Sequence, residues 1–411
     1  MTSCSTNAVI SPVGRSYLRL QRVPDVGPIR ARKLVAHFGS VEAIWSASMA
    51  ELQHVDGIGP HVAESVFRSR GDKGVEEEIA KALDCELRIL CPEDGEYPKP
   101  LLHIPDPPIC LYVRGTLQPA DSVAIAIVGT RRCSHYGREQ ALRFGEALAS
   151  AGFTVVSGLA RGIDGEAHRG ALRGGGRTIA VLGNGLGAVY PPEHGELADE
   201  IAKSGALLSE LEVDIAPDAK NFPPRNRIIV GLSLGVVVIE AGDKSGALIT
   251  ARLASEYNRE VFALPGAIDR PAQNAGSNAL IRDGGAKLIT CLDDILDELG
   301  EVGRVLRADD SPRAPRSTHH ADAPLFAAAN LADHERAIVE AIAGGIEEVE
   351  GICASTRLDA GFVTSTLTAL QLRGLIRQLP GSRFVCRANA VSEPRAQARG
   401  PRNDDSIDGR R

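Results

Sequence analysis

Ala-Ile-Ala-Ile-Val-Gly-Thr-Arg-Arg-Cys-Ser-His-Tyr-Gly, at residues 124–137, is the stretch that decides the fold. Its first five residues form an unbroken apolar run, which is typical of a strand buried on both faces in a parallel sheet covered by helices. A helical pattern follows from Arg138 to Ala151. The glycine-arginine segment between them is therefore expected at the carboxyl edge of the sheet, where open α/β folds bind their ligands.

This loop has the residue types of an anion-binding site. Gly129 opens a turn before a helix, and the first N–H groups of a helix are free to bind an anion. Arg131 and Arg132 add planar guanidinium groups whose paired donors match phosphate oxygens. The loop therefore predicts a phosphate contact, and no chemical step is assigned to it.

Strands and helices alternate from Val123 to Thr290. The predicted strands are 124–128, 154–157, 178–182, 206–209, 236–239, 261–264 and 286–289. The predicted helices are 138–151, 163–173, 193–203, 226–233, 247–257 and 278–282. Two shorter strands, at 86–90 and 109–113, precede them. The pattern predicts an α/β core with a doubly wound parallel sheet over residues 85–300.

Residues 1–84 read as short helices joined by two similar turns. These are Val-Pro-Asp-Val-Gly-Pro at 23–28 and Val-Asp-Gly-Ile-Gly-Pro at 55–60, each followed by a helical pattern. Glycine permits a tight turn, and proline is favoured at the first helical position. The pair resembles a tandem helix-hairpin-helix module, whose hairpin amides bind DNA phosphate. A compact helical domain without a DNA contact is the alternative, because Glu64 follows the second turn and that helix lacks a basic start.

Residues 331–388 have the layout of a winged helix, a helix-turn-helix variant. Helical patterns at 332–343, 346–355 and 361–373 precede two short strands that flank the turn Leu-Pro-Gly-Ser at 379–382. The third helix carries polar residues that suit a DNA groove: Thr364, Ser365, Thr366, Thr368, Gln371 and Arg373. A protein partner is the alternative for this domain.

Two segments lack periodicity. Residues 301–330 read as a linker, and residues 389–411 read as a disordered tail. His319 and His320 lie in the linker, and as adjacent residues they point apart, so no metal site is predicted there.

Composition narrows the class of protein. The chain has 411 residues, enough for two or three domains, and no apolar run reaches the roughly 18 residues that cross a bilayer. Its eight cysteines are scattered without a C-x-x-C pair, which predicts neither a zinc site nor disulfides and favours the reducing cytoplasm. The net charge of −7 argues mildly against nucleic acid, but arginine clusters can form basic patches on an acidic protein.

Further loops are expected at the same sheet edge. Together they carry six cations: Arg131, Arg132, Arg161, Lys220, Arg225 and Arg227. This number exceeds what one small metabolite needs, and Phe222 and Tyr136 offer stacking surfaces for bases. The loops therefore predict a track for a polyanion. The alternative for some of these arginines is a structural ion pair with Asp164, Glu166 or Glu240.

Four motifs resemble the bacterial DNA-processing DprA/Smf family. They are residues 128–137, residues 157–168 (Ser-Gly-Leu-Ala-Arg-Gly-Ile-Asp-Gly-Glu-Ala-His), residues 222–233 (Phe-Pro-Pro-Arg-Asn-Arg-Ile-Ile-Val-Gly-Leu-Ser) and residues 244–251 (Lys-Ser-Gly-Ala-Leu-Ile-Thr-Ala). The order of modules also agrees, with a Rossmann-like core between the two flanking domains. The resemblance implies a single-stranded DNA-binding protein that protects incoming DNA and loads the RecA recombinase onto it in natural transformation. It also implies homodimerisation through the core, no cofactor and no enzymatic activity.

The resemblance also assigns roles to residues. It implies that Arg131 binds a backbone phosphate and that Phe222 stacks on a base. The basic residue ahead of that ring falls on Lys220. Ser157, Gly158 and Asn226 are expected to form the pocket and not to act as catalysts.

Two nucleotide-enzyme interpretations compete with this one. The run Gly-Asn-Gly-Leu-Gly-Ala at 183–188 fits a dinucleotide fingerprint, with Glu210 at the expected distance, but Val-Tyr-Pro-Pro at 189–192 delays the helix. A related Rossmann-like family hydrolyses nucleotide N-glycosidic bonds. Its Gly-Gly-Gly-x-Gly-Thr-x-x-Glu signature is missing here, and Asp164 and Glu240 are the candidate acids for that alternative.

Overall fold

The computed structural model describes residues 9–300, 302, 333–343, 346, 348–356, 358–372, 376–379 and 383–386. The chain divides into two compact units, Met1–Arg313 and Ala314–Arg411. Apart from residue 302, the predicted linker with His319 and His320 lies outside the described residues, as does the predicted tail. The domain boundaries inferred from the sequence stay predictions.

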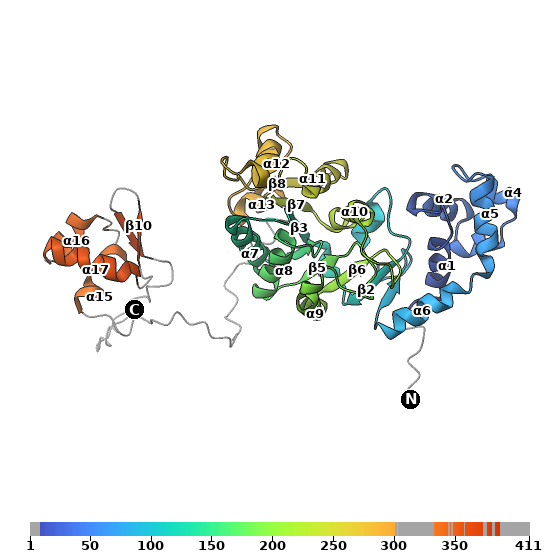
Figure 1. The fold of residues 1–411 in the computed structure, drawn as a ribbon, viewed down its shortest axis with the longest axis horizontal. Helices are drawn as coiled ribbons and strands as arrows, with labels where there is room; N and C mark the ends of the chain where they lie inside the picture. The colour runs from blue at the N-terminus through green and yellow to red at the C-terminus, as the bar shows by residue number, and fades with distance from the viewer. Residues whose placement is uncertain are drawn as a thin grey trace, which may run out of the picture. The chain divides into compact units, whose positions relative to one another are not determined.

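The first unit is built on a nine-stranded sheet with the order β1-β2-β6-β5-β4-β3-β7-β8-β9 (Figure 1). The strands are β1 Arg88–Leu90, β2 Leu111–Gly115, β3 Ala124–Gly129, β4 Thr154–Ser157, β5 Thr178–Val181, β6 Ala206–Ser209, β7 Gly235–Ile239, β8 Glu260–Ala263 and β9 Lys287–Leu288. Strands β3 to β9 are parallel, and β1 and β2 extend the sheet antiparallel at one end. The predicted α/β fold is confirmed, and its strand order reverses between β3 and β7.

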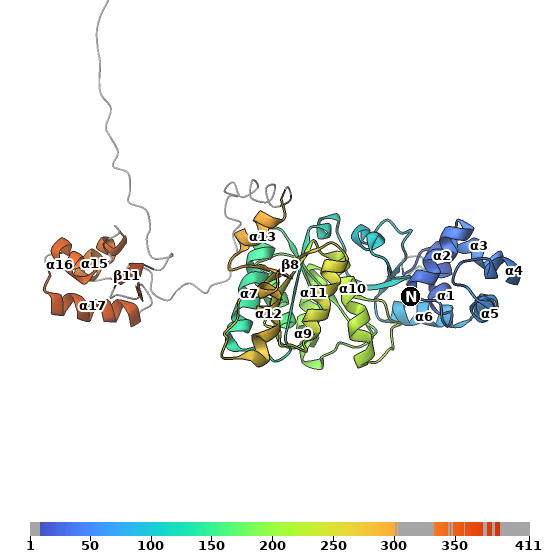
Figure 2. The ribbon, with the colours of Figure 1, turned by 90° about the horizontal axis from the view of Figure 1, so that it is seen from above.

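Helices cover both faces of this sheet. They are α7 His135–Ser150, α8 Ile163–Arg173, α9 Gly195–Ser204, α10 Phe222–Leu232, α11 Gly246–Glu256, α12 Pro271–Arg282 and α13 Leu292–Glu298. Ile125 and Ile127 pack with α7, α8 and α13, whereas Ala126 and Val128 face α10 and α11. Figure 2 shows α10 and α11 running side by side over their face. The unbroken apolar run of β3 is thus buried on both faces, as its sequence predicts.

Helices α10 and α12 begin four or more residues earlier than the sequence pattern placed them. Helix α10 begins at Phe222, four residues before the predicted start, and α12 begins at Pro271, seven residues before its predicted start. Prolines stand in the first turn of both helices, where the missing N–H has no helical partner to lose. Phe222 is therefore the first residue of a helix, and its ring is carried by regular structure.

Six helices precede the sheet and form a helical head. They are α1 Pro12–Gln21, α2 Pro28–Phe38, α3 Val41–Ser46, α4 Met49–Gln53, α5 Pro60–Arg68 and α6 Gly74–Asp84. Short 3₁₀ helices lie at Ser69–Gly71, Lys99–His103, Pro119–Ser122, Pro192–His194 and Ala219–Asn221. Arg30 of α2 bridges the two hairpin turns, since it donates to the carbonyl oxygens of both Asp25 and Gly57. Arg30, at the start of the first hairpin helix, is thus bonded within the head.

The head and the sheet share one hydrophobic core. Leu18, Leu20 and Ile79 of the head belong to the same buried cluster as Tyr112 and Leu207 of the sheet. Polar contacts join the two parts as well. The buried Glu78 carboxylate accepts a hydrogen bond from Val213 N at 2.7 Å, and Gln21 bonds both Cys110 N and Glu210 O.

The second unit is a small winged helix. It consists of α15 Asp333–Ala343, α16 Val349–Thr356, α17 Ala360–Leu372, β10 Ile376–Leu379 and β11 Arg383–Cys386. The two strands form an antiparallel hairpin in which Ile376 pairs with Cys386. In α17 the hydroxyl of Thr366 is buried and donates to Phe362 O, and the hydroxyl of Thr364 donates to Ala360 O. Arg373 and the side chains of Ser365, Thr368 and Gln371 lie outside the described part of the chain.

Candidate nucleic-acid interface

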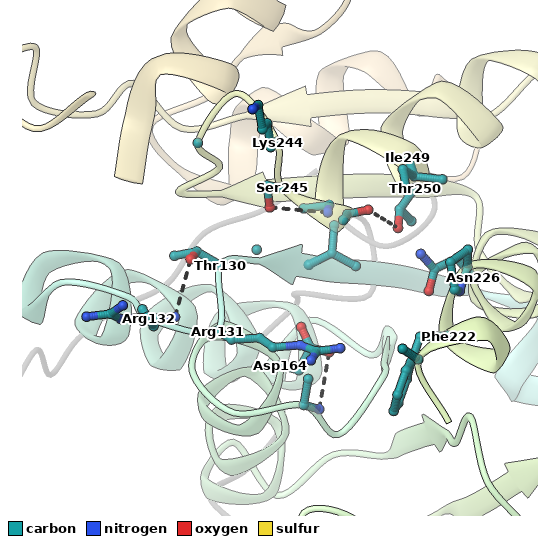
Figure 3. Close-up of a pocket in the computed structure, with 18 of the residues that line it drawn as sticks. Thr130, Arg131, Arg132, Asp164, Phe222, Asn226, Lys244, Ser245, Ile249 and Thr250 are labelled. Atoms are coloured by element: carbon teal, nitrogen blue, oxygen red, sulfur yellow. Dashed lines mark hydrogen bonds between the residues drawn. The ribbon is translucent and has the colours of Figure 1, made fainter. Parts of the chain in front are cut away.

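A cleft of about 920 Å³ opens at the carboxyl edge of the sheet, where the loops after β3 and β7 diverge (Figure 3). Diverging loops at such a switch point leave space for a ligand in open α/β sheets. Four basic side chains line the cleft, namely Arg131, Arg132, Arg225 and Lys244. Two acidic side chains, Asp164 and Asp243, also line it. The cleft therefore carries a net positive charge on an acidic chain.

The arginine loop is held in place by Glu240, the residue after β7. Its backbone oxygen accepts from Thr130 N at 2.8 Å, and its carboxylate accepts from Ser134 N at 2.8 Å. The Ser134 hydroxyl donates to the same carboxylate and caps α7 by accepting from Gly137 N. Glu240 is buried and has a positive φ of 52°, which an L-residue adopts only under structural constraint. It fixes both ends of the turn that carries Arg131.

Arg131 and Arg132 project from this loop as exposed side chains. The Arg131 guanidinium carbon lies 5.0 Å from the centroid of the Phe222 ring, within cation–π distance. In the part of the chain that the structure describes, neither arginine side chain has a hydrogen-bonded partner. Figure 3 shows Arg131 reaching along the cleft wall toward Asp164 and Phe222. Their donors are therefore available to an anion in the cleft.

A buried pair of charges supports this wall from below. Burial raises the pKa of Asp164, while the nearby Arg225 and Arg131 guanidinium groups oppose that shift. Asp164 accepts from Ala160 N at 3.3 Å. Burial lowers the pKa of Arg225 to about 10, so the group stays charged at neutral pH. Arg225 donates to the Val181 carbonyl oxygen, and its Nε has no hydrogen-bonded partner among the described residues.

Gly158 makes room for Arg225. A Cβ atom on this glycine would lie 1.9 Å from Arg225 Nη1. The neighbouring Ser157 is buried, and its hydroxyl donates to Ile127 O at 2.6 Å. These two residues thus shape the floor beneath the cleft and do not line it.

Five of the predicted site residues line the cleft: Arg131, Arg132, Phe222, Arg225 and Asn226. Three predicted cations do not. Arg227 is buried and pairs with Asp106 at 2.9 Å and Glu210 at 2.6 Å, which makes it a structural cation of α10. Lys220 is exposed and pairs with Asp218, and Arg161 forms two hydrogen bonds with Glu193.

The opposite wall carries residues that the sequence-based site did not include. Lys244, Ser245 and Thr250 line it from the β7–α11 loop and the start of α11. Tyr190, from the loop after β5, also lines the cleft. Tyr136 does not, because its hydroxyl donates to Pro265 O outside the cleft. The sequence motif at 244–251 was a signal for the first group, whereas strand order was needed to place Tyr190.

The glycine run at 183–188 has a structural explanation. Gly185 N donates to Ile215 O at 2.8 Å, and Gly187 N donates to Val213 O at 3.0 Å. A Cβ on Gly185 would lie 2.0 Å from Glu212 O, so the glycine allows two chain segments to approach closely. Helix α9 begins only at Gly195. The amides of Gly185 and Gly187 are thus bonded to protein, and no α-helix N-terminus follows directly for a pyrophosphate.

Two further features concern the described residues as a whole. Among the helices that the structure describes, none combines the length and apolar character that spanning a bilayer requires. In the same residues, no group of three or more His, Cys, Asp or Glu side chains could hold a metal ion.

Comparison with known proteins extends over almost the whole chain. Residues 88–300 match the family model of DNA recombination-mediator protein A. Residues 22–79 match the helix-hairpin-helix motif, and residues 322–382 match the DprA winged helix domain. The Smf protein of Synechocystis is 36% identical over 389 residues, which cover 90% of this chain and 97% of that protein. The DNA processing protein DprA of Bacillus subtilis is 42% identical over 50% of this chain and 69% of its own length.

A solved structure agrees with the fold. The X-ray structure of DNA processing protein A from Streptococcus pneumoniae has a TM-score of 0.59 and 34% sequence identity, covering 69% of this chain and 95% of that chain. A helix-hairpin-helix head, a doubly wound sheet and a winged helix, in this order along the chain, define a modular class of α/β protein. Within that class, this chain belongs to the DprA/Smf family of DNA-processing proteins.

Proposed function

We propose that the cleft binds single-stranded DNA, and that the protein protects incoming DNA and loads the RecA recombinase onto it in natural transformation and recombination. The observation that carries the DNA-binding part is Arg131, whose guanidinium has no hydrogen-bonded partner among the described residues and lies over the Phe222 ring inside a net-positive cleft. Arginine supplies paired donors for phosphate, and an aromatic ring supplies a surface on which any base can stack. One wall therefore offers both halves of a nucleotide contact.

The remaining parts of the proposal rest on family membership. The family is described as DNA recombination-mediator protein A, which supports a recombinase as partner. A second copy of this chain is proposed as the other partner. Six cysteines are free thiols, which supports a reducing cytoplasmic location; they are Cys85, Cys91, Cys110, Cys133, Cys291 and Cys353.

A binding titration tests the DNA contact. The wild type should bind a single strand such as oligothymidylate more tightly than duplex DNA, and its affinity should fall as salt rises.

Variants of the cleft test the site itself. Phe222→Ala should weaken binding by roughly 1–3 kcal/mol if the ring stacks on a base, and Arg131→Ala should lower both affinity and salt dependence. Phe222→Leu keeps apolar bulk without an aromatic face and should resemble Phe222→Ala. Arg143→Ala, which removes an exposed arginine of α7 outside the cleft, is the matched control. Undiminished binding by both cleft variants would refute the site.

RecA loading needs a separate measurement. The wild type should accelerate RecA filament growth on DNA already covered by single-strand-binding protein, and Arg131→Ala should lose most of that acceleration. If the wild type binds DNA but gives no acceleration at any ratio, the loading role fails and DNA binding stands.

Hydrolysis of nucleotide N-glycosidic bonds is the second candidate function. The observation that favours it is Asp164, a cleft-lining carboxyl whose pKa is raised by burial. Such a group can act as a general acid. Release of free base from nucleoside monophosphates, abolished in Asp164→Asn, would support it. Glu240, the other candidate acid, is bonded to the arginine loop and does not line the cleft.

A further inference from the structure

Tyr190 lies beside Phe222 on the cleft wall. The two ring centroids are 6.1 Å apart, and the rings are tilted by 43°. This spacing falls within the range of aromatic contacts, but the tilt prevents the faces from stacking on each other. Tyr190 is half-buried and lines the same cleft as Phe222. Two aromatic rings, one from the loop after β5 and one from the start of α10, are therefore neighbours at the edge of one sheet.

Hydrogen bonds within the loop and to a neighbouring segment hold the loop that carries Tyr190 in place. The buried Asn184 side chain donates to Gly185 O at 2.9 Å and to Ala188 O at 2.7 Å. Backbone bonds from the glycine run tie the loop to Val213 and Ile215 of the segment after β6. A ring on such a loop is pre-organised, so little conformational freedom is lost when a ligand contacts it.

Arg161 supports Tyr190 from the neighbouring loop. Its guanidinium carbon lies 6.0 Å from the centroid of the Tyr190 ring. Glu193 holds the same guanidinium through two hydrogen bonds, one of them 3.0 Å from Nη2 to Oε2. The carboxylate offsets the positive charge, and its bidentate geometry fixes the plane of the guanidinium. Arg161 is therefore better placed to position the Tyr190 ring than to bind a phosphate.

We propose that Tyr190 is a second base-stacking platform, next to Phe222, and that Arg161 is its positioning residue. This inference rests on the proposed binding of single-stranded DNA. The wall then takes two neighbouring bases of one strand, one on each ring, while Arg131 lies over Phe222 with donors for the backbone. Stacking on aromatic rings tolerates any base, so the pair adds affinity without reading sequence.

The first test is an equilibrium titration of the full chain with fluorescently labelled oligothymidylate. Tyr190→Ala should weaken binding by about 5- to 150-fold, the range found when one stacked aromatic is removed. Tyr190→Phe keeps the stacking face and should bind like the wild type. Arg143→Ala, which changes an exposed residue of α7 outside the cleft, should also bind like the wild type. Unchanged binding by a folded Tyr190→Ala protein would overturn the proposal.

Cross-linking keeps the proposal testable even if Tyr190→Ala fails to fold. An oligothymidylate with single 5-iododeoxyuridine substitutions, irradiated on the wild-type protein, should link covalently to Tyr190 at one position and to Phe222 at an adjacent one. Links to Phe222 alone would overturn the second platform and leave the proposed function intact. Absence of binding by the wild type would instead refute the proposed function.

Arg161 has its own diagnostic. If Arg161 positions Tyr190, Arg161→Gln should weaken binding without changing its salt dependence. Combining Arg161→Gln with Tyr190→Phe or Tyr190→Ala should then weaken binding no more than the stronger of the two single variants. A direct phosphate contact predicts the opposite, namely a salt slope lower by about one unit and an effect that adds to that of Tyr190→Ala. Glu193→Gln should follow Arg161→Gln if the carboxylate holds the guanidinium in place.

Discussion

Single residues beneath the cleft decide whether its cations are correctly placed. Gly158 is one of them, because a Cβ there would overlap the Arg225 guanidinium. We expect Gly158→Ala to push Arg225 away from the Val181 carbonyl and to weaken oligothymidylate binding. Titration of the variant checks this, with Gly195→Ala as control, since nothing lies within 4 Å of a Cβ at that position. Equal affinity in Gly158→Ala and the wild type would contradict the supporting role.

A second prediction at this scale concerns acid stability. His168 is fully buried in α8, and burial lowers its pKa from the ordinary value of 6.5 to about 3. The Thr178 hydroxyl donates to Val155 O, so it accepts a hydrogen bond from His168 Nδ1 at 2.7 Å. The other ring nitrogen of His168, Nε2, is buried and has no hydrogen-bonded partner among the described residues. The unfolded chain takes up a proton below pH 6.5 that the folded chain refuses until about pH 3. Stability contributed by neutral His168 is therefore fully present above pH 6.5 and is lost as the pH falls.

Because only one proton is involved, the free energy of unfolding can fall by at most about 1.4 kcal/mol per pH unit through this group. Urea unfolding between pH 7 and pH 4.5 measures it. His168→Gln should be less stable at pH 7 but should lose less stability on acidification. Parallel profiles for the two proteins would show that another group controls acid sensitivity.

At the scale of elements, the cleft depends on how the β3–α7 loop is tied to the end of β7. Glu240→Gln puts an amide group where a carboxylate accepts two bonds from Ser134. We expect a loss of about 1–3 kcal/mol in the free energy of unfolding, because a buried donor loses its acceptor. Oligothymidylate binding should weaken as well, since Arg131 is carried by the same loop. Urea unfolding and titration check both effects, and Glu139→Gln on the exposed side of α7 is the control.

The elements of the sheet were predictable from the sequence, whereas their neighbours in space were not. Unbroken apolar runs such as 124–128 identify strands because both faces are buried. The starts of α10 and α12 are hard to predict from apolar periodicity, because both first turns contain proline, which a first helical turn accepts. Arg227 could not be told from a DNA contact, because only the fold brings Asp106 and Glu210 to it. Tyr190 was missed for the same reason.

At the scale of the first unit, the head and the sheet should unfold together because they share a core. Glu78→Ala leaves the buried Val213 N–H without its acceptor and should destabilise both parts by about 1–3 kcal/mol. Hydrogen exchange followed by mass spectrometry at increasing urea checks this. Peptides from α1 and β3 should lose protection at the same concentration, lower than in the wild type. Glu77→Ala, which removes an exposed carboxylate of the same helix, is the control. Earlier opening of α1 than of β3 would show that the head is an independent domain.

The two edges of the sheet differ in a way that bears on how copies of the molecule can associate. The outer side of β1 is occupied, since Ile89 N donates to Val9 O at 2.7 Å and Ile10 bridges to Ile89. At the other edge, in the part of the chain that the structure describes, β9 pairs only with β8 and is two residues long. Among the described residues, the nine-stranded sheet therefore leaves only its β9 edge open to a further strand. If two copies paired through β9 about a two-fold axis, the pairing would use the open edge of this sheet in both copies, so this sheet would offer no described edge for a third copy to extend.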